Sequence, residues 1–81
     1  MEYIDKLLRL DRTLEVSKSY DGYVHVCYHG CWIKDVMFLK GTFGRGLSFS
    51  EACKNYCDEI SGKILVFDPF TDHRQEIVVL F

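Results

Sequence analysis

One segment of this chain carries a complete helix signature, and the rest of the chain must fold around that helix. Ser48 is followed three residues later by Glu51, which is a capping box because the serine side chain can accept from the Glu51 amide. Gly62 is placed to end the helix, since glycine adopts the left-handed conformation without strain. Between them the apolar residues form one stripe: Phe49, Ala52, Cys53, Tyr56 and Ile60. The sequence therefore predicts one amphipathic helix that needs an apolar surface to pack against.

Short runs of β-branched and aromatic residues, separated by turn residues, lie on both sides of this helix. The predicted strands cover residues 13–19, 23–28, 31–39, 63–67 and 76–81. Asp21-Gly22 joins the first two strands, and this pair favours a type I′ hairpin turn. His29-Gly30 gives the next turn. The glycine-rich residues 41–46 are interpreted as a flexible connection that leads into the helix.

A shorter helix is predicted near the beginning of the chain, where Ile4, Leu7 and Leu8 recur at helical spacing. The predicted element order is then α-β-β-β-α-β-β. One main helix packed on an antiparallel sheet of four or five strands is the simplest way to bury the apolar faces of both. The sequence thus predicts an α+β fold in a single domain over residues 1–81.

The composition argues against several classes of protein. Hydrophobic residues make up 48% of the chain and aromatic residues 15%, which is ample for a core and argues against disorder. Ten Lys and Arg against twelve Asp and Glu give a net charge of −2, whereas nucleic-acid binders usually carry a basic excess. No apolar stretch approaches the roughly 20 residues that span a bilayer. The first residues lack the pattern of a secretion signal, so we expect a cytoplasmic protein without a membrane or nucleic-acid partner.

The four cysteines form two pairs with the same spacing, and this pattern allows a zinc site. Cys53 and Cys57 share one face of the predicted helix. Cys27 and Cys31 flank the second turn, where a tight reversal would bring their sulfur atoms together. Tetrahedral zinc takes four such ligands at spacings of this kind. Histidines at positions 25 and 29 share a strand face with Cys27, so a mixed cysteine and histidine site is also open.

A second interpretation of the cysteines needs no metal. Cysteines of a cytoplasmic protein stay reduced and are commonly buried thiols. Cys53 lies on the apolar stripe of the helix in any case. If residues 23–33 form one straight strand, Cys27 and Cys31 are about 13 Å apart and cannot share a metal ion. Zinc and buried thiols both remain open from the sequence.

Nothing in the sequence marks an enzyme. No cysteine or histidine is distinguished as an activated nucleophile or base. The Gly44-x-Gly46 loop lacks both the dinucleotide fingerprint and the Lys-Ser/Thr pair of a phosphate-binding loop. We therefore predict a protein that acts by binding a partner, either as a monomer or as a homodimer paired through an exposed edge strand. The candidate partner contacts are residues in or near predicted turns: Trp32, Phe43, Arg45, Phe70, Asp72 and His73.

The stretch from Gly44 to Tyr56, together with Ile60-Ser61-Gly62-Lys63 and the apolar strand after it, carries a resemblance. It resembles small bacteriophage and prophage accessory proteins that share a Gly-x-Gly loop, a Ser or Thr cap, Glu-Ala-Cys and Ser-Gly-Lys. This resemblance implies a protein that binds and disables a host factor, and anti-CRISPR proteins that block a CRISPR nuclease are one such group. The loop, cap and Glu-Ala portion also resembles HicB-type antitoxins, which implies a small basic toxin as the partner.

Overall fold

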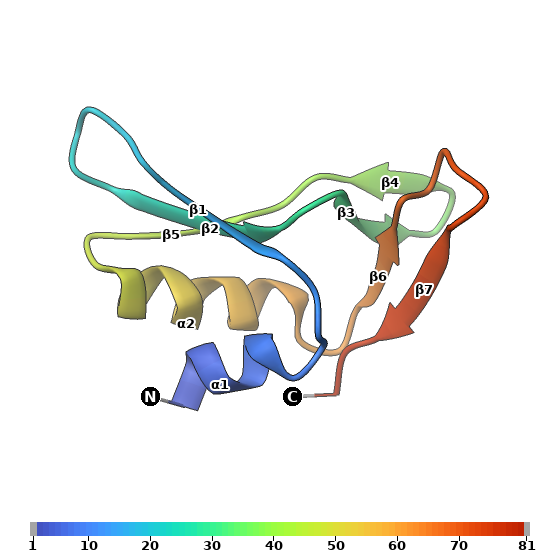
Figure 1. The fold of residues 1–81 in the computed structure, drawn as a ribbon, viewed down its shortest axis with the longest axis horizontal. Coiled ribbons are helices and arrows are strands. Elements are labelled where there is room, and N and C mark those ends of the chain that lie inside the picture. Colours follow the sequence, from blue (N-terminus) through green and yellow to red (C-terminus); the bar gives the residue numbers. More distant parts are fainter. Residues whose placement is uncertain (1, 81) are drawn as a thin grey trace.

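The computed structural model describes residues 2–80, which form two helices and seven strands (Figure 1). The elements in chain order are α1 (Glu2–Leu8), β1 (Leu14–Lys18), β2 (Val24–Tyr28), β3 (Cys31–Asp35), β4 (Phe38–Lys40), β5 (Gly44–Gly46), α2 (Phe49–Ile60), β6 (Ile64–Phe67) and β7 (Gln75–Val78). The predicted α+β class is confirmed, and the predicted order of elements broadly matches. Phe81, the end of the last predicted strand, lies outside the described residues.

The strands are divided between two antiparallel sheets instead of the one sheet that the sequence suggested. The first sheet has the order β1-β2-β5 and the second has the order β4-β3-β6-β7. The division occurs at His29-Gly30, where Gly30 has a φ of 63°. The predicted turn is present, but it does not fold β3 back onto β2. Instead β3 leaves the first sheet and pairs with β4 and β6.

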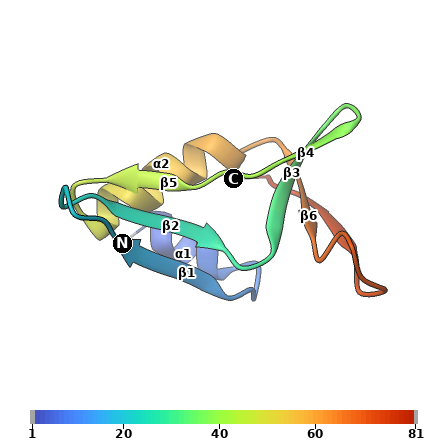
Figure 2. The ribbon, with the colours of Figure 1, turned by 90° about the horizontal axis from the view of Figure 1, so that it is seen from above.

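Both helices lie on one face of the first sheet, and the second sheet extends beyond them (Figures 1 and 2). Helix α2 packs on β2 and β5, and α1 packs on α2. The main core joins buried side chains from both helices and both sheets: Leu7, Val26, Tyr28, Ile33, Ala52, Cys53, Tyr56, Cys57, Ile60, Leu65, Phe67 and Val79. The far part of the second sheet lies outside this core.

Helix α2 begins and ends close to the predicted residues. The Ser48 hydroxyl accepts from the Glu51 amide at 3.1 Å, as the capping box requires. The predicted stripe is buried except for Phe49, which is 41% exposed. Side chains lean toward the N-terminal end of a helix, so the side chain of this first helical residue points past the packed surface. At the other end, Gly62 has a φ of 75° and the Lys63 amide donates to the Ile60 carbonyl at 3.0 Å, which closes a type II turn.

The predicted flexible connection over residues 41–46 contains a strand, and glycine is the reason. Val24 and Val26 of β2 pair with Gly46 and Gly44 of β5. A Cβ atom on Gly44 would lie 2.2 Å from the Ala52 carbonyl oxygen of α2. A Cβ atom on Gly46 would lie 2.7 Å from the Ala52 amide nitrogen. The two glycines therefore allow a strand to contact the helix backbone directly, although glycine has a low intrinsic preference for strands.

The hairpin between β1 and β2 has a longer loop than the predicted type I′ turn. Gly22 has a φ of 86°, and its amide donates to the Ser19 carbonyl at 3.0 Å. The Ser19 amide donates to the Tyr23 carbonyl at 2.9 Å. This pattern is a type I turn followed by a glycine bulge, which needs a positive φ only at the glycine. The Asp21 carboxylate accepts from the Tyr23 amide at 3.2 Å and from the Ser19 hydroxyl, and these bonds stabilise the loop.

Candidate functional site

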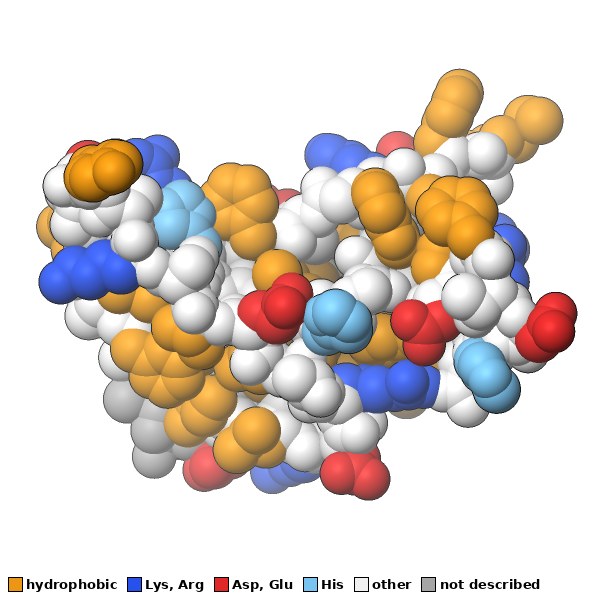
Figure 3. Space-filling model, turned by 45° about the horizontal axis from the view of Figure 1, so that its top comes forward, with side chains coloured by type: hydrophobic (Ala, Val, Ile, Leu, Met, Phe, Trp, Pro, Cys, Tyr) orange, Lys and Arg blue, Asp and Glu red, His pale blue; other side chains and the backbone are white. Residues whose placement is uncertain are grey.

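Three consecutive large apolar residues are exposed at the turn between β3 and β4. Asp35 pairs with Phe38, so the turn consists of Val36 and Met37 alone. Val36, Met37 and Phe38 are 85%, 88% and 75% exposed, and we call these three residues the apolar tip. Apolar side chains stand out at this end of the second sheet in Figure 3. A folded protein rarely leaves such a run in water unless the run contacts something else.

The backbone of the apolar tip is strained. Val36 has a φ of 54°, which is the left-handed region that β-branched residues avoid. A two-residue hairpin turn with a positive φ at its first position normally has glycine there. The strand predicted to run unbroken over residues 31–39 is therefore a hairpin. Its turn carries no Gly, Asn or Pro, so the residues that usually mark a hairpin turn are absent. Strain of this kind persists at binding surfaces, where the side chain itself is needed.

Replacing Val36 with asparagine should stabilise the isolated protein. Asparagine adopts the left-handed conformation readily, so V36N should raise the free energy of unfolding by about 1 kcal/mol. Urea denaturation measures this change. Met37→Asn is the matched control, because Met37 is equally exposed but does not have a positive φ. Equal stability of wild type and V36N would show that the Val36 backbone is not strained.

The outer face of the second sheet continues from the apolar tip. Trp32 pairs with Val66, and Val66 pairs with Glu76, so the three side chains form one row on this face. Val66 is fully buried but does not belong to the main core, which indicates a small second apolar cluster around Trp32. Val78, in the next row of the same face, is exposed. No helix packs on this face in the described part of the chain.

A groove lies beside the apolar tip. It has a volume of about 420 Å³ and is lined by Lys34, Val36, Met37, Phe38, Leu39 and Arg74. We call it the tip groove. Lys34 Nζ and Arg74 Nη2 both pair with the Glu76 carboxylate, at 3.2 Å and 3.0 Å. Hydrogen bonds from Lys34 and, to a smaller extent, from Arg74 lower the pKa of Glu76 below its ordinary value. Two cations therefore share one carboxylate at the edge of an apolar groove.

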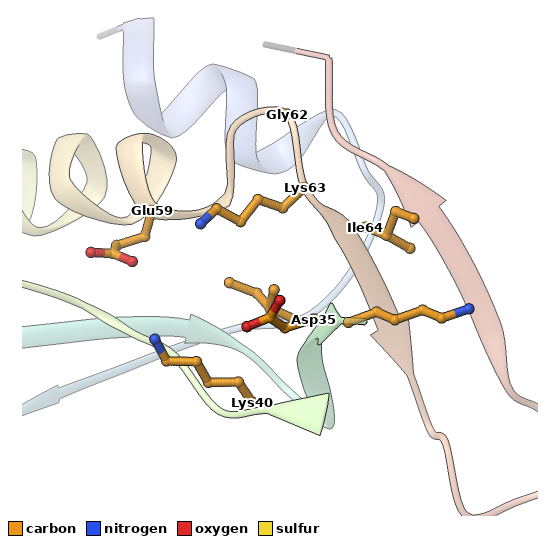
Figure 4. Close-up of a pocket in the computed structure, with 8 residues that line it drawn as sticks. Asp35, Lys40, Glu59, Gly62, Lys63 and Ile64 are labelled. Atoms are coloured by element: carbon orange, nitrogen blue, oxygen red, sulfur yellow. The ribbon is translucent and has the colours of Figure 1, made fainter. Parts of the chain in front are cut away.

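A second hollow lies on the opposite side of the same hairpin, between β3, β4 and the end of α2 (Figure 4). Its volume is about 370 Å³. The carboxylates of Asp35 and Glu59 and the side chains of Lys40 and Lys63 extend into it, and their formal charges cancel. Within the described residues, none of these four side chains forms an ion pair within 4.0 Å. Lys34, whose Nζ pairs with Glu76, lines both this hollow and the tip groove.

Two of the predicted partner contacts lie on the outer face of the first sheet, which no described helix covers (Figure 2). The ring of Phe43 lies 5.1 Å from the ring of His25. The Arg45 guanidinium lies 3.8 Å from the centre of the Tyr23 ring and pairs with Asp21 at 3.1 Å. Phe43 and Arg45 are thus both exposed, but each is held by a neighbour on its own sheet.

The other predicted contacts lie at two further places, so the predicted set does not form one surface. Trp32 belongs to the outer face of the second sheet. Phe70, Asp72 and His73 are exposed in the loop between β6 and β7, where Asp72 and His73 line a polar hollow with Arg12. Because β3 and β6 are antiparallel, this loop is at the opposite end of the second sheet from the apolar tip. The apolar tip was not among the predicted contacts, although four consecutive apolar residues over 36–39 break the alternation expected of a half-exposed strand.

The four cysteines do not form the zinc site that their spacing allowed. Among residues 2–80, no three His, Cys, Asp or Glu side chains are placed to hold a metal ion. Cys53 and Cys57 point from α2 into the core. Cys27 alternates with the buried Val26 and Tyr28, so its thiol lies on the other face of the first sheet, beside His25 and Phe43. The first sheet therefore lies between Cys27 and the two cysteines of α2, whereas Cys31 at the start of β3 packs against the core. All four cysteines are free thiols.

These thiols should react slowly in the folded protein. Burial raises the pKa of Cys31 to about 11 and the pKa of Cys57 to about 11. Burial also raises the pKa of Cys27 and Cys53 above the ordinary value. At pH 8 the thiolate fraction of a thiol with a pKa near 11 is roughly a hundredfold below that of an ordinary cysteine.

We expect the folded protein to label with a disulfide reagent at pH 8 much more slowly than the same protein in denaturant. The labelling rates of Cys31 and Cys57 should still rise between pH 9 and pH 11. Peptide mapping of the labelled protein identifies which thiols have reacted. Fast labelling of all four thiols in the folded state at pH 8 would contradict the burial described above.

In residues 2–80, no helix is long and apolar enough to cross a membrane. Comparison with family models, with curated proteins and with solved structures finds no match to this chain. The apolar tip and the tip groove are therefore interpreted from their own geometry and chemistry.

Proposed function

We propose that this protein binds a host protein through the apolar tip and inhibits it, in the manner of small bacteriophage proteins. The observation that supports this most directly is the exposure of Val36, Met37 and Phe38 on a strained turn. Exposed apolar residues at the centre of an interface supply much of the binding free energy when a partner covers them. A CRISPR nuclease is the specific host factor that the sequence resemblance suggests, and the host cytosol is the corresponding location.

Binding accounts for the remaining polar groups better than catalysis does. The raised pKa values of the thiols disfavour the thiolate that a nucleophilic cysteine needs. In the described part of the chain, Cys31 and Cys57 form hydrogen bonds with backbone carbonyls, and Cys31 also with the Tyr56 hydroxyl, but neither bonds to a histidine ring. His29 pairs with Glu15 on the surface, at 3.2 Å. These groups are therefore explained by packing and surface contacts.

The residues that resemble HicB-type antitoxins have a structural explanation here. Gly44 and Gly46 allow β5 to contact α2, and Ser48 caps that helix. These roles belong to the framework and do not indicate a toxin as the partner. We therefore base the proposal on the apolar tip, which lies outside the resembling segment.

The proposal is tested by affinity capture from host lysate with three versions of the protein. Wild type should capture one host protein in stoichiometric amount. A Met37→Ser/Phe38→Ser variant should lose it, because truncating two central apolar contacts costs about 2–4 kcal/mol of binding free energy. Phe70→Ser is the matched control, since Phe70 is also exposed but lies at the other end of the second sheet. The captured protein is then assayed for its activity with and without each version.

Two results would contradict the proposal. One is a partner that the Met37→Ser/Phe38→Ser variant still captures while Phe70→Ser does not. The other is a captured host enzyme whose activity is the same with and without the protein. Circular dichroism and urea denaturation of each variant show that loss of capture does not come from loss of the fold.

A further inference from the structure

The tip groove differs in charge from the protein as a whole. The chain has a net charge of −2, but the lining of the groove contains two cations and no carboxylate. Glu76 neutralises one of the two, so the unit of Lys34, Glu76 and Arg74 keeps a formal charge of +1. All three side chains are exposed to solvent, at 39%, 43% and 37% for Lys34, Arg74 and Glu76, so salt should screen this charge.

The remaining charged groups of the hairpin do not cancel this charge inside the groove. Asp35 and Lys40 line the second hollow, on the opposite side of the hairpin, and their charges offset each other there. The groove itself is completed by the apolar tip and by Leu39. Its lining therefore combines four apolar residues with two cationic donors. An occupant that matches it must be apolar and negatively charged.

We infer that the tip groove binds an acidic apolar segment of the partner protein. An apolar side chain of that segment packs against Met37, Phe38 and Leu39. Its carboxylate approaches Lys34 and Arg74, which already hold a carboxylate in the free protein. The inference rests on the proposed function and specifies the chemistry of the partner. It also excludes the basic nucleic-acid channel of a nuclease as the surface that this groove contacts.

A lipid surface would need the same apolar residues but a different charge pattern. Asp35 directly precedes the apolar tip, and an inserted tip would bring this carboxylate to the anionic headgroups. The net charge of −2 further disfavours an anionic membrane. A protein segment is therefore the occupant that the charges favour.

The test uses three matched sets of short synthetic peptides on the full-length protein. Each set carries the same Leu and Phe anchors, flanked by Asp and Glu, by Lys and Arg, or by Asn and Gln. Fluorescence anisotropy should show the acidic set binding about tenfold more tightly than the basic set at low salt, and the difference should shrink at high salt. The Met37→Ser/Phe38→Ser variant should bind none of the sets.

Variants of the charged residues separate a binding role from a structural one. Lys34→Gln/Arg74→Gln should remove the preference for the acidic set. Glu76→Gln should strengthen binding of the acidic set about threefold, because it removes the carboxylate that competes for the two cations. A merely structural ion pair would give weaker binding in both variants. Lys54→Gln, which removes a cation that pairs with Asp58 on α2, is the matched control and should change nothing.

The outcomes distinguish this inference from the proposed function. Equal binding of all three sets, still lost in the Met37→Ser/Phe38→Ser variant, would overturn the acidic preference and leave the protein-binding role intact. No binding of any set would also overturn the inference. If the Met37→Ser/Phe38→Ser variant still binds the peptides and still captures the host protein, both the inference and the proposed function are wrong. If wild type co-sediments with phosphatidylglycerol vesicles, the Met37→Ser/Phe38→Ser variant does not, and no peptide binds, then the tip contacts a lipid surface and not a protein segment.

Discussion

Replacing Gly44 with alanine should destabilise the protein more than a Gly→Ala substitution at any other glycine. The new Cβ atom would lie 2.2 Å from the Ala52 carbonyl oxygen and 2.4 Å from Tyr56 Cβ. The first of these atoms is helix backbone, so no side-chain rotation can relieve the clash. We expect the free energy of unfolding to fall by about 3 kcal/mol or more. That is a large share of the roughly 5 kcal/mol expected for a domain of this size.

Gly41→Ala is the matched control for this prediction. Its Cβ atom would lie 3.5 Å from the Trp32 ring, which is an ordinary contact, and its φ is not positive. Urea denaturation should therefore place G41A within about 0.5 kcal/mol of wild type. If G44A were as stable as G41A, the direct contact between β5 and α2 would not exist as described.

Replacing Tyr56 with phenylalanine should have the second largest effect. The hydroxyl of this fully buried residue accepts from the Tyr28 amide at 3.1 Å, beyond the point where β5 stops pairing with β2. Tyr28 in turn donates its own hydroxyl to the Leu7 carbonyl of α1. Removing the Tyr56 hydroxyl leaves a buried amide without a partner, which costs about 1–3 kcal/mol. The two tyrosines thus join both helices to the first sheet.

Urea denaturation and amide exchange of Tyr28 measure this effect. The exchange of the Tyr28 amide should accelerate more than the exchange of its neighbours in β2. Tyr20→Phe is the control, since Tyr20 is fully exposed and should change the stability little. Unchanged protection of the Tyr28 amide in Y56F would contradict the predicted role of the hydroxyl.

The pH dependence of stability provides a further check on the same tyrosines. Burial raises the pKa of Tyr56 and of Tyr28 above the ordinary value near 10. The folded protein therefore keeps these protons when the unfolded chain would lose them. Their contribution is fully present below pH 10, and it is lost as the pH rises above that value. Stability should fall more steeply above pH 10 in wild type than in Y56F.

The sequence predicted the elements whose signals are local. The cap at Ser48, the buried stripe of α2 and the turn at Gly62 all depend on residues within a few positions of one another. The sequence failed where distant contacts decide the structure. Gly44 to Gly46 is a strand because β2 and α2 hold it there, and Val36 forms a turn because β3 pairs with both β4 and β6. Neither result is encoded in the preferences of the residues themselves.

The candidate site was only partly accessible from the sequence for the same reason. Trp32 lies near the surface that we favour, whereas Phe43 and Phe70 lie elsewhere. The two sheets are joined at Gly30, and the way they are joined decides which turn residues share a surface. A single glycine in the sequence does not reveal that arrangement. The spacing of the cysteines was misleading because Cys27 lies on the outer face of the first sheet, whereas Cys53 and Cys57 point from α2 into the core on its inner face.

The apolar tip is also a position at which the sequence can vary without a change in the scaffold. The strands β2 and β5 pair directly, although the whole excursion from Cys31 to Lys40 lies between them in the chain. The two residues at its turn have no role in the core. New sequences grafted at Val36 and Met37 should therefore leave the scaffold folded while they alter what it recognises. Under the proposed function, a library randomised at these two positions would be a source of binders with new specificities.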